Sequence, residues 1–222
     1  MQVIADLFQV HTGHQARLSF GSSGKFTAQI INGAPFEVFL SADAAKPARL
    51  LVTDGLAVAG TDFTYALGRL VLWSAQTDYV DAEGKILANG AYRHLAVADP
   101  KLAPYGRAAQ QVLDALQLTE QLSTRFVQGV FPDLPVCRIE QVPSWALSPW
   151  RRIMQDGEIN TGSAWVVPTE LYEPIRQDAV LLKSGADNEA ATALLAFMRS
   201  AMQERGILRL HPAASAGWSG RY

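Results

Sequence analysis

Residues 16–30, ARLSFGSSGKFTAQI, constrain the fold more than any other stretch of this sequence. They predict a strand at residues 16–20, a tight Gly-Ser-Ser-Gly loop, and a helix that begins near Lys25. The first N–H groups of a helix have no intrahelical partner, and the helix dipole makes that end mildly positive. Because Ser22 and Ser23 add hydroxyl donors, the loop suits an anion held by neutral groups. Serine and glycine are also ordinary capping and turn residues, so a purely structural interpretation stays open.

Strands alternate with helices along most of the remaining chain. Short apolar runs predict strands at residues 37–40, 68–74, 94–98, 124–127, 163–167 and 178–183. Apolar residues at helical spacing predict helices within residues 1–12, 44–53, 107–116 and 188–204. Residues 76–91 are interpreted as a polar surface excursion, and residues 154–157 as the end of a helical piece. This alternation predicts an α/β fold with mostly parallel sheets and flanking helices.

A second strand–loop–helix unit supplies another donor. After the strand at residues 94–98, the run Ala103-Pro104-Tyr105-Gly106 is predicted to form a loop directly before a helix, and Tyr105 brings a phenolic hydroxyl. Two such units that face each other across a cleft could enclose a small oxyanion without an arginine. Removing a dianion from water is costly, and several short hydrogen bonds to its oxygens offset that cost.

The composition argues against several other functions. A formal net charge of −2 over 222 residues, without a run of basic residues, gives no electrostatic footprint for nucleic acid. No apolar run is long enough to span a bilayer, and a single cysteine excludes an internal disulfide. Asp43 and Asp99 follow strands, where a carboxylate more often caps the next helix than catalyses a reaction. Since GSSGK matches neither a P-loop nor a nucleophile elbow, we expect no enzyme and no cofactor.

The first residues show a helical pattern without a start signal. Met1, Ile4, Ala5 and Phe8 lie on one helical face, and no capping residue precedes them. A helix that begins uncapped at the first position leads us to expect missing sequence upstream. The opening MQVIADLFQVHTGHQ has neither the basic start nor the apolar core of a signal peptide.

Three segments of the chain resemble one known family. FGSSGKFTAQIINGAPFEVFLSAD is similar to the F-x-S-S, L-x-x-Q-I-x-x-G-A-P-x-D-V-F-x-S-A-D run of periplasmic molybdate-binding proteins, the solute receptors of molybdate ABC transporters. LAVADPKLAPYGRAAQQVLDALQL resembles their second loop segment, and GSAWVVPTELYEPIRQDAVLLKSGADNEAATALLAFMRS their hinge and C-terminal helix. Together these similarities cover residues 1–129 and 153–200. They imply a two-lobed type II periplasmic-binding-protein fold.

The resemblance also implies a function and a binding site. Molybdate or tungstate would be caught by hydroxyls and backbone amides, with no residue bound directly to the metal, and delivered to the ABC transporter permease. The second serine of the motif, an oxyanion ligand in the family, is Ser23, and the loop tyrosine is Tyr105. A hinge position that is often tyrosine in the family is Gln177, and Ser22 is a secondary candidate through its amide or hydroxyl. We expect a periplasmic monomer that binds no nucleic acid.

The family's architecture predicts how the chain divides into lobes. Residues 1–72 and 178–222 are expected to form a discontinuous lobe 1, and residues 73–177 to form lobe 2. Hinge crossings between the lobes are expected near residues 68–74 and 165–180.

Two departures from the family pattern predict an impaired receptor. The family begins with a strand whose terminal loop carries another serine or threonine ligand, and this chain starts after it. Residues 130–152, VFPDLPVCRIEQVPSWALSPWRR, hold four of the eleven prolines where the family has a helix and a strand. We interpret this segment as a translated frame shift. Codons can be chosen for residues 143–151 that, one frame over, give Glu-Leu-Gly-Phe-Val-Ala-Leu-Ala, the strand that the family pattern requires.

Two other functions stay open on the sequence. Hydrogen-bond donors alone do not exclude another tetrahedral oxyanion, such as sulfate or phosphate, and the size of the cleft would separate these from the larger molybdate. A two-lobed ligand-sensing domain of a regulator is the second alternative. The lack of a helix-turn-helix extension in this sequence counts against it.

Overall fold

The computed structural model describes residues 1–90, 92–101, 103–129, 136–140, 154–155, 158–159, 162–205 and 208–210. The chain divides into two compact units. Met1–Leu67 and Arg176–Leu208 form unit 1, and Gly68–Ile175 belong to unit 2. No helix among these described residues is long and apolar enough to cross a membrane. The lobe boundaries expected from the family stay a prediction.

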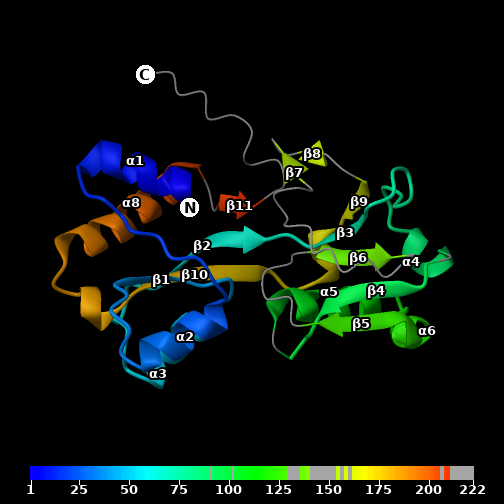
Figure 1. The fold of residues 1–222 in the computed structure, drawn as a ribbon, viewed down its shortest axis with the longest axis horizontal. Coiled ribbons are helices and arrows are strands. Elements are labelled where there is room, and N and C mark those ends of the chain that lie inside the picture. The colour runs from blue at the N-terminus through cyan, green and yellow to red at the C-terminus, as the bar shows by residue number, and fades with distance from the viewer. Residues whose placement is uncertain are drawn as a thin grey trace. The chain divides into compact units, whose positions relative to one another are not determined.

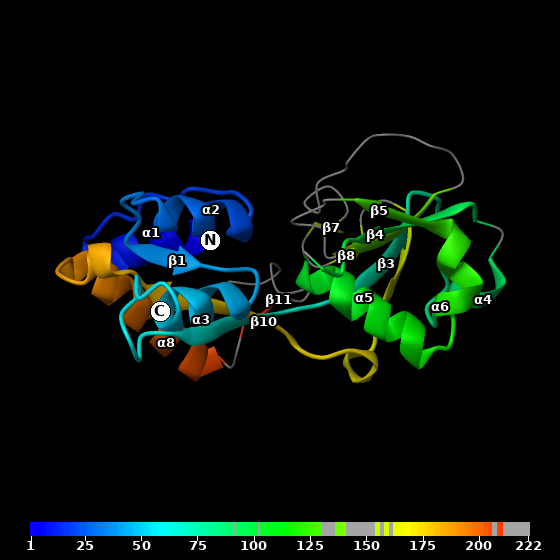
Figure 2. The same cartoon turned by 90° about the horizontal axis from the view of Figure 1, so that it is seen from below.

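Unit 1 is built on a four-stranded sheet with helices on both faces (Figure 1, Figure 2). In sheet order, its strands are β1 (Val38–Leu40), β10 (Ile175–Leu181), β2 (Phe63–Gly68) and β11 (Leu208–Leu210). On one face lie α1 (Gln2–Thr12) and α8 (Glu189–Arg205), the latter preceded by the 3₁₀ turn η3 (Lys183–Gly185). The other face carries α2 (Ser23–Ile31) and α3 (Ala45–Val52).

Alternating side chains of β10 contribute to the core on both faces of this sheet. Ala179 and Leu181 pack in one cluster with Leu195 of α8, whereas Val180 packs in another with Leu50 of α3. Successive residues of a strand point to opposite faces, which explains the alternation. The two clusters therefore hold β10 from both sides.

Unit 2 is built on a five-stranded sheet. In sheet order, its strands are β5 (Phe126–Gly129), β4 (His94–Ala98), β6 (Val136–Glu140), β3 (Val71–Ser74) and β9 (Ser163–Val166). Its helices and 3₁₀ turns are α4 (Ile86–Asn89), α5 (Pro104–Ala115), α6 (Thr119–Leu122), η1 (Ser123–Arg125) and η2 (Thr169–Leu171). β7 (Met154–Gln155) and β8 (Glu158–Ile159) form a separate antiparallel pair. Helix α5 packs Val112 and Leu113 into one buried cluster with Leu72 and Leu95 of the sheet.

The predicted α/β class is confirmed, but the described strand pairs are mixed rather than mostly parallel. β3 pairs with β6 and β4 with β5 in parallel, whereas β1–β10, β3–β9, β4–β6 and β7–β8 are antiparallel. Two of the antiparallel strands, β9 and β10, lie late in the chain and pair with β3 and β1, which lie early in it. A pattern of alternating strands and helices does not reveal such pairing between distant segments.

The predicted strand at residues 16–20 is absent. Ala16 and Leu18 are half-buried and alternate with exposed neighbours, as in a strand that packs on one face. A strand also needs a hydrogen-bonded partner, and no described strand of either unit pairs with this segment. The alternation reflects packing of an extended segment against unit 1, where Ala16 contacts the cluster around Phe8.

The strand predicted over residues 68–74 is two strands. Gly68 ends β2 and Val71 begins β3. Between them, the Leu70 N–H donates to the Tyr172 hydroxyl at 3.2 Å, and the Leu70 carbonyl accepts the Val167 N–H at 3.0 Å. The backbone of Leu70 is therefore bonded to Tyr172 and Val167 rather than to a strand of the four-stranded sheet. The break between β2 and β3 falls within an apolar run, so the sequence pattern does not reveal it.

Two smaller expectations are also wrong. Residues 154–157 contain β7 and no end of a helix among their described positions. The supposed surface excursion at residues 76–91 buries Val80 and Leu87 and contains α4. Apart from the backbone of β6, the segment interpreted as a frame shift lies outside the described residues.

Candidate functional site

The N-terminus of α2 is capped by a serine. Ser22 Oγ accepts the backbone N–H of Lys25 at 3.3 Å, and the Ser22 carbonyl accepts that of Phe26 at 3.1 Å. The helix thus begins at Ser23, two residues earlier than predicted. The N–H groups of Ser23 and Gly24 stand in the first turn, where no preceding turn supplies an acceptor. Capping and donor roles therefore coexist at this loop.

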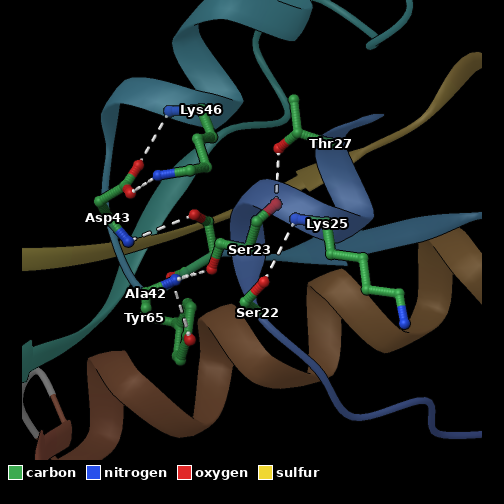
Figure 3. A network of polar contacts seen from close by, with 9 residues as sticks. Ser22, Ser23, Lys25, Thr27, Ala42, Asp43, Lys46 and Tyr65 are labelled. Atoms are coloured by element: carbon green, nitrogen blue, oxygen red, sulfur yellow. Dashed lines mark hydrogen bonds and ion pairs between the residues drawn. The ribbon is translucent and has the colours of Figure 1, made fainter. Parts of the chain in front are cut away.

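The Ser23 hydroxyl joins α2 to the loop between β1 and α3 (Figure 3). Ser23 Oγ accepts the backbone N–H of Ala42 at 2.9 Å, and the Ser23 carbonyl accepts the Thr27 hydroxyl at 2.7 Å. Ser23 itself is half-buried. Because its oxygen accepts on the Ala42 side, the hydroxyl hydrogen must donate in another direction. The hydroxyl hydrogen of Ser23 therefore points away from the Ala42 N–H.

The loop after β1 is tightly hydrogen-bonded. Ser41 is fully buried, and its Oγ accepts the backbone N–H of Asp43 at 3.2 Å. The buried Asp43 carboxylate accepts the N–H of Lys46 in the first turn of α3 at 2.9 Å and also pairs with the Lys46 ammonium (Figure 3). Asp43 therefore serves the start of the next helix, as its position after a strand predicts.

The cation beside this loop is neutralised. A Cβ at Gly24 would lie 3.8 Å from Lys46 Cε, so the lysine side chain runs past the start of α2. Its ammonium is paired with Asp43. The backbone N–H groups and the Ser23 hydroxyl at this helix start are uncharged donors. Among the described residues, no group of three or more His, Cys, Asp or Glu side chains could hold a metal ion.

Tyr65 of β2 links the same loop to β10. Its hydroxyl lies 3.2 Å from the Ser41 carbonyl oxygen and 3.2 Å from Gln177 Oε1. Gln177 is buried, two residues before the stretch of β10 that pairs with β1. The single phenolic hydrogen is shared between these two acceptors, and the Gln177 NH₂ group lies on the side of the amide away from Tyr65.

Tyr105 belongs to unit 2, where it lies in the first turn of α5. The predicted loop at residues 103–106 is wrong, because the helix already begins at Pro104, a residue suited to the first helical position. Gly106 lets this turn lie against the end of β4: a Cβ there would come within 2.8 Å of the carbonyl carbons of Ala98 and Asp99. Tyr105 is half-buried and packs against the core of unit 2.

The structure brings some of the sequence-predicted residues together. Ser22 and Ser23 share one helix start, and Gln177 is connected to the neighbouring Ser41 through Tyr65, all in unit 1. Tyr105 stands in unit 2. Sequence reasoning missed Tyr65, whose contacts span 24 and 112 residues and leave no local signal.

Comparisons with known proteins identify the class. The family model for bacterial extracellular solute-binding proteins matches residues 1–209, and the chain belongs to that family. The chain is 47% identical over 207 residues to the molybdate-binding protein ModA of Azotobacter vinelandii, covering 90% of this chain and 79% of that one. It is 46% identical over 199 residues to the protein of the same name from Rhodobacter capsulatus, covering 89% and 77%.

A solved structure agrees with this assignment. The periplasmic molybdate-binding protein of Azotobacter vinelandii superposes with a TM-score of 0.72 at 38% identity, covering 89% of this chain and 87% of that one. The family resemblance and the fold class predicted from the sequence are therefore confirmed.

Proposed function

We propose that this chain is the solute-binding receptor of an ABC transporter, that it works in the periplasm as a monomer, and that its solute is molybdate or tungstate. Membership of the solute-binding family supports the receptor role. The 46–47% identity to two proteins named for molybdate binding supports the solute. Tungstate has the same charge and tetrahedral shape, so the same donors suit it. The transporter permease is the partner to which the receptor delivers the anion.

The Ser23 hydroxyl is the observation that carries this proposal. It stands at the start of α2, and its oxygen accepts the N–H of Ala42, so its hydrogen donates elsewhere. The N–H groups of Ser23 and Gly24 lie in the same turn. A tetrahedral dianion at this point gains several charge-assisted hydrogen bonds and the favourable end of the helix dipole.

Three further residues complete the proposed site. Ser22 uses its hydroxyl oxygen to cap α2, so it contributes through its backbone N–H. Gln177 contributes the NH₂ group whose direction Tyr65 sets. Tyr105 is the proposed donor of unit 2, at a second helix start. All these donors are neutral, so the affinity depends on the number and placement of hydrogen bonds rather than on ion pairing.

Calorimetric titration of the purified chain with molybdate, tungstate, sulfate and phosphate tests the proposal. We expect one-to-one binding of molybdate and tungstate and much weaker binding of the two smaller anions. Tight sulfate binding would assign the receptor to a different tetrahedral oxyanion. A cooperatively folded chain that binds none of the four anions would contradict the receptor function itself.

A further inference from the structure

Gly68 occupies a place where an added Cβ would clash with two neighbouring side chains. It is the last residue of β2 and is buried. A Cβ at this position would lie 2.9 Å from Tyr105 Cζ, closer still to the Tyr105 hydroxyl oxygen, and 3.1 Å from Ile175 Cγ2. Carbon atoms in van der Waals contact stay about 3.5–4.0 Å apart, so an added methyl group must displace a neighbour.

Tyr105 is the neighbour that would move. Ile175 is buried in the core cluster of unit 2, which resists displacement. The backbone of Tyr105 is also fixed, because the adjacent Gly106 holds the first turn of α5 against the end of β4. What can yield is the half-buried Tyr105 ring, whose hydroxyl is the atom nearest to the added carbon.

We propose that Gly68 is a positioning residue for the solute: by lacking a side chain, it keeps the place that the Tyr105 hydroxyl occupies. The inference rests on the proposed function, in which Tyr105 donates a hydrogen bond to the bound oxyanion. Gly68 then contributes to affinity without touching the solute. An alanine at position 68 removes the contribution of Tyr105 while the hydroxyl itself is still present.

A double-mutant cycle in molybdate affinity tests this role. Gly68→Ala is expected to weaken binding by about the same factor as Tyr105→Phe, about 10- to 100-fold for one hydrogen bond to a charged group. Added to the Tyr105→Phe variant, Gly68→Ala should change the affinity by less than about threefold, because the hydroxyl is already gone. A purely structural role of Gly68 would instead give additive losses, and that result would overturn the inference.

Thermal unfolding without any anion tests the steric contact independently. Gly68→Ala should lower the melting temperature, and Tyr105→Ala, which removes the ring, should restore part of the loss. Tyr172→Phe is the matched control: its hydroxyl accepts the N–H of Leu70 on the same crossing segment, and it should not rescue Gly68→Ala. If Gly68→Ala alone does not fold, the double variant with Tyr105→Ala should.

The two experiments separate the inference from the proposed function. A wild-type chain that binds no molybdate overturns the proposed function, and with it the role of Gly68 in affinity. The unfolding cycle then decides alone whether Gly68 makes room for Tyr105. Lack of rescue by Tyr105→Ala, or equal rescue by Tyr172→Phe, overturns the steric contact even if molybdate binds.

Discussion

Ser23 Oγ accepts the backbone N–H of Ala42 at 2.9 Å, and this bond fixes the start of α2 to the loop that follows β1. The two residues lie 19 positions apart, on different elements. The bond directs the hydroxyl hydrogen of Ser23 away from the Ala42 N–H. The Ser23 hydroxyl therefore has a structural task, and in the proposed site it also has a binding task.

Replacing Ser23 should affect both tasks. Ser23→Ala removes the proposed donor and leaves the Ala42 N–H without its acceptor. Molybdate affinity should fall by about 10- to 100-fold, the value of one hydrogen bond to a charged group. Unfolding should also require less denaturant. Calorimetry measures the first effect and urea unfolding the second.

A distant serine supplies the control for this variant. Ser200 is an exposed residue of α8, and its hydroxyl donates to the Phe197 carbonyl. Ser200→Ala should leave the affinity as it is. Equal affinities of Ser23→Ala and wild type would place the solute elsewhere.

Substitutions of Ser22 can separate the effect of helix capping on stability from the effect of charge on anion binding. Asparagine and aspartate cap helices as well as serine does, so Ser22→Asn and Ser22→Asp should both retain stability, whereas Ser22→Ala should lose about 0.5–2 kcal/mol. Aspartate also places a negative charge beside the proposed anion. Ser22→Asp should therefore weaken molybdate binding by about tenfold or more, and Ser22→Asn much less. Similar affinities of these two variants would argue against an anion at this helix start.

Tyr65 should contribute to affinity through Gln177. Tyr65→Phe removes the hydroxyl that lies 3.2 Å from Gln177 Oε1 and from the Ser41 carbonyl. Loss of a hydrogen bond typically costs about 0.5–1.5 kcal/mol, and the Gln177 amide loses its contact with the phenol. We expect lower stability together with weaker molybdate binding. In Gln177→Leu, where no amide remains to orient, the further effect of Tyr65→Phe on affinity should shrink; undiminished losses would contradict this role.

The environment of Asp81 leads us to expect that the free energy of unfolding decreases at acidic pH. Its carboxylate accepts the backbone N–H groups of Glu83, Lys85 and Ile86 at 2.8–3.0 Å. Burial raises the pKa of Asp81, but the backbone hydrogen bonds together outweigh it and hold the pKa below its ordinary value of 3.8. A lowered folded-state pKa gives stability that is present above the unfolded pKa. It is lost as the pH falls through the folded value.

Urea unfolding of wild type and Asp81→Asn at decreasing pH measures this contribution. The wild type should be the more stable chain near neutral pH, because asparagine keeps an acceptor but not the charge. The difference should shrink below about pH 3.8 as the carboxylate is protonated. A difference that does not change with pH would show that the charge of Asp81 has no part in stabilising the turn before α4.

Local patterns predicted several elements well. The strand at residues 94–98 has the predicted bounds, and the helix over residues 188–204 differs by one residue at each end. Both have unbroken periodicity. The prediction of one strand over residues 68–74 is wrong because the apolar Leu70 lies between β2 and β3. Its N–H bonds to the Tyr172 hydroxyl and its carbonyl to the Val167 N–H. Pairing partners, unlike side-chain periodicity, are not encoded within a strand.

The candidate site was predicted in the same uneven way. The serine loop was recognised because small residues before a helix have a local meaning. The bond from Ala42 to Ser23 and the link from Tyr65 to Gln177 arise only when distant segments meet in one sheet and its loops. The sequence around Gly68 does not show why a glycine is needed there, because a Cβ at that position would clash with the distant Tyr105 side chain.

Titration of wild type and Ser23→Ala with molybdate, in the presence of excess sulfate, tests the central claim most directly. The account predicts one-to-one binding by the wild type that sulfate does not suppress, and a clearly weaker affinity for Ser23→Ala. Binding that sulfate abolishes, or identical molybdate affinities of the two chains, would contradict it.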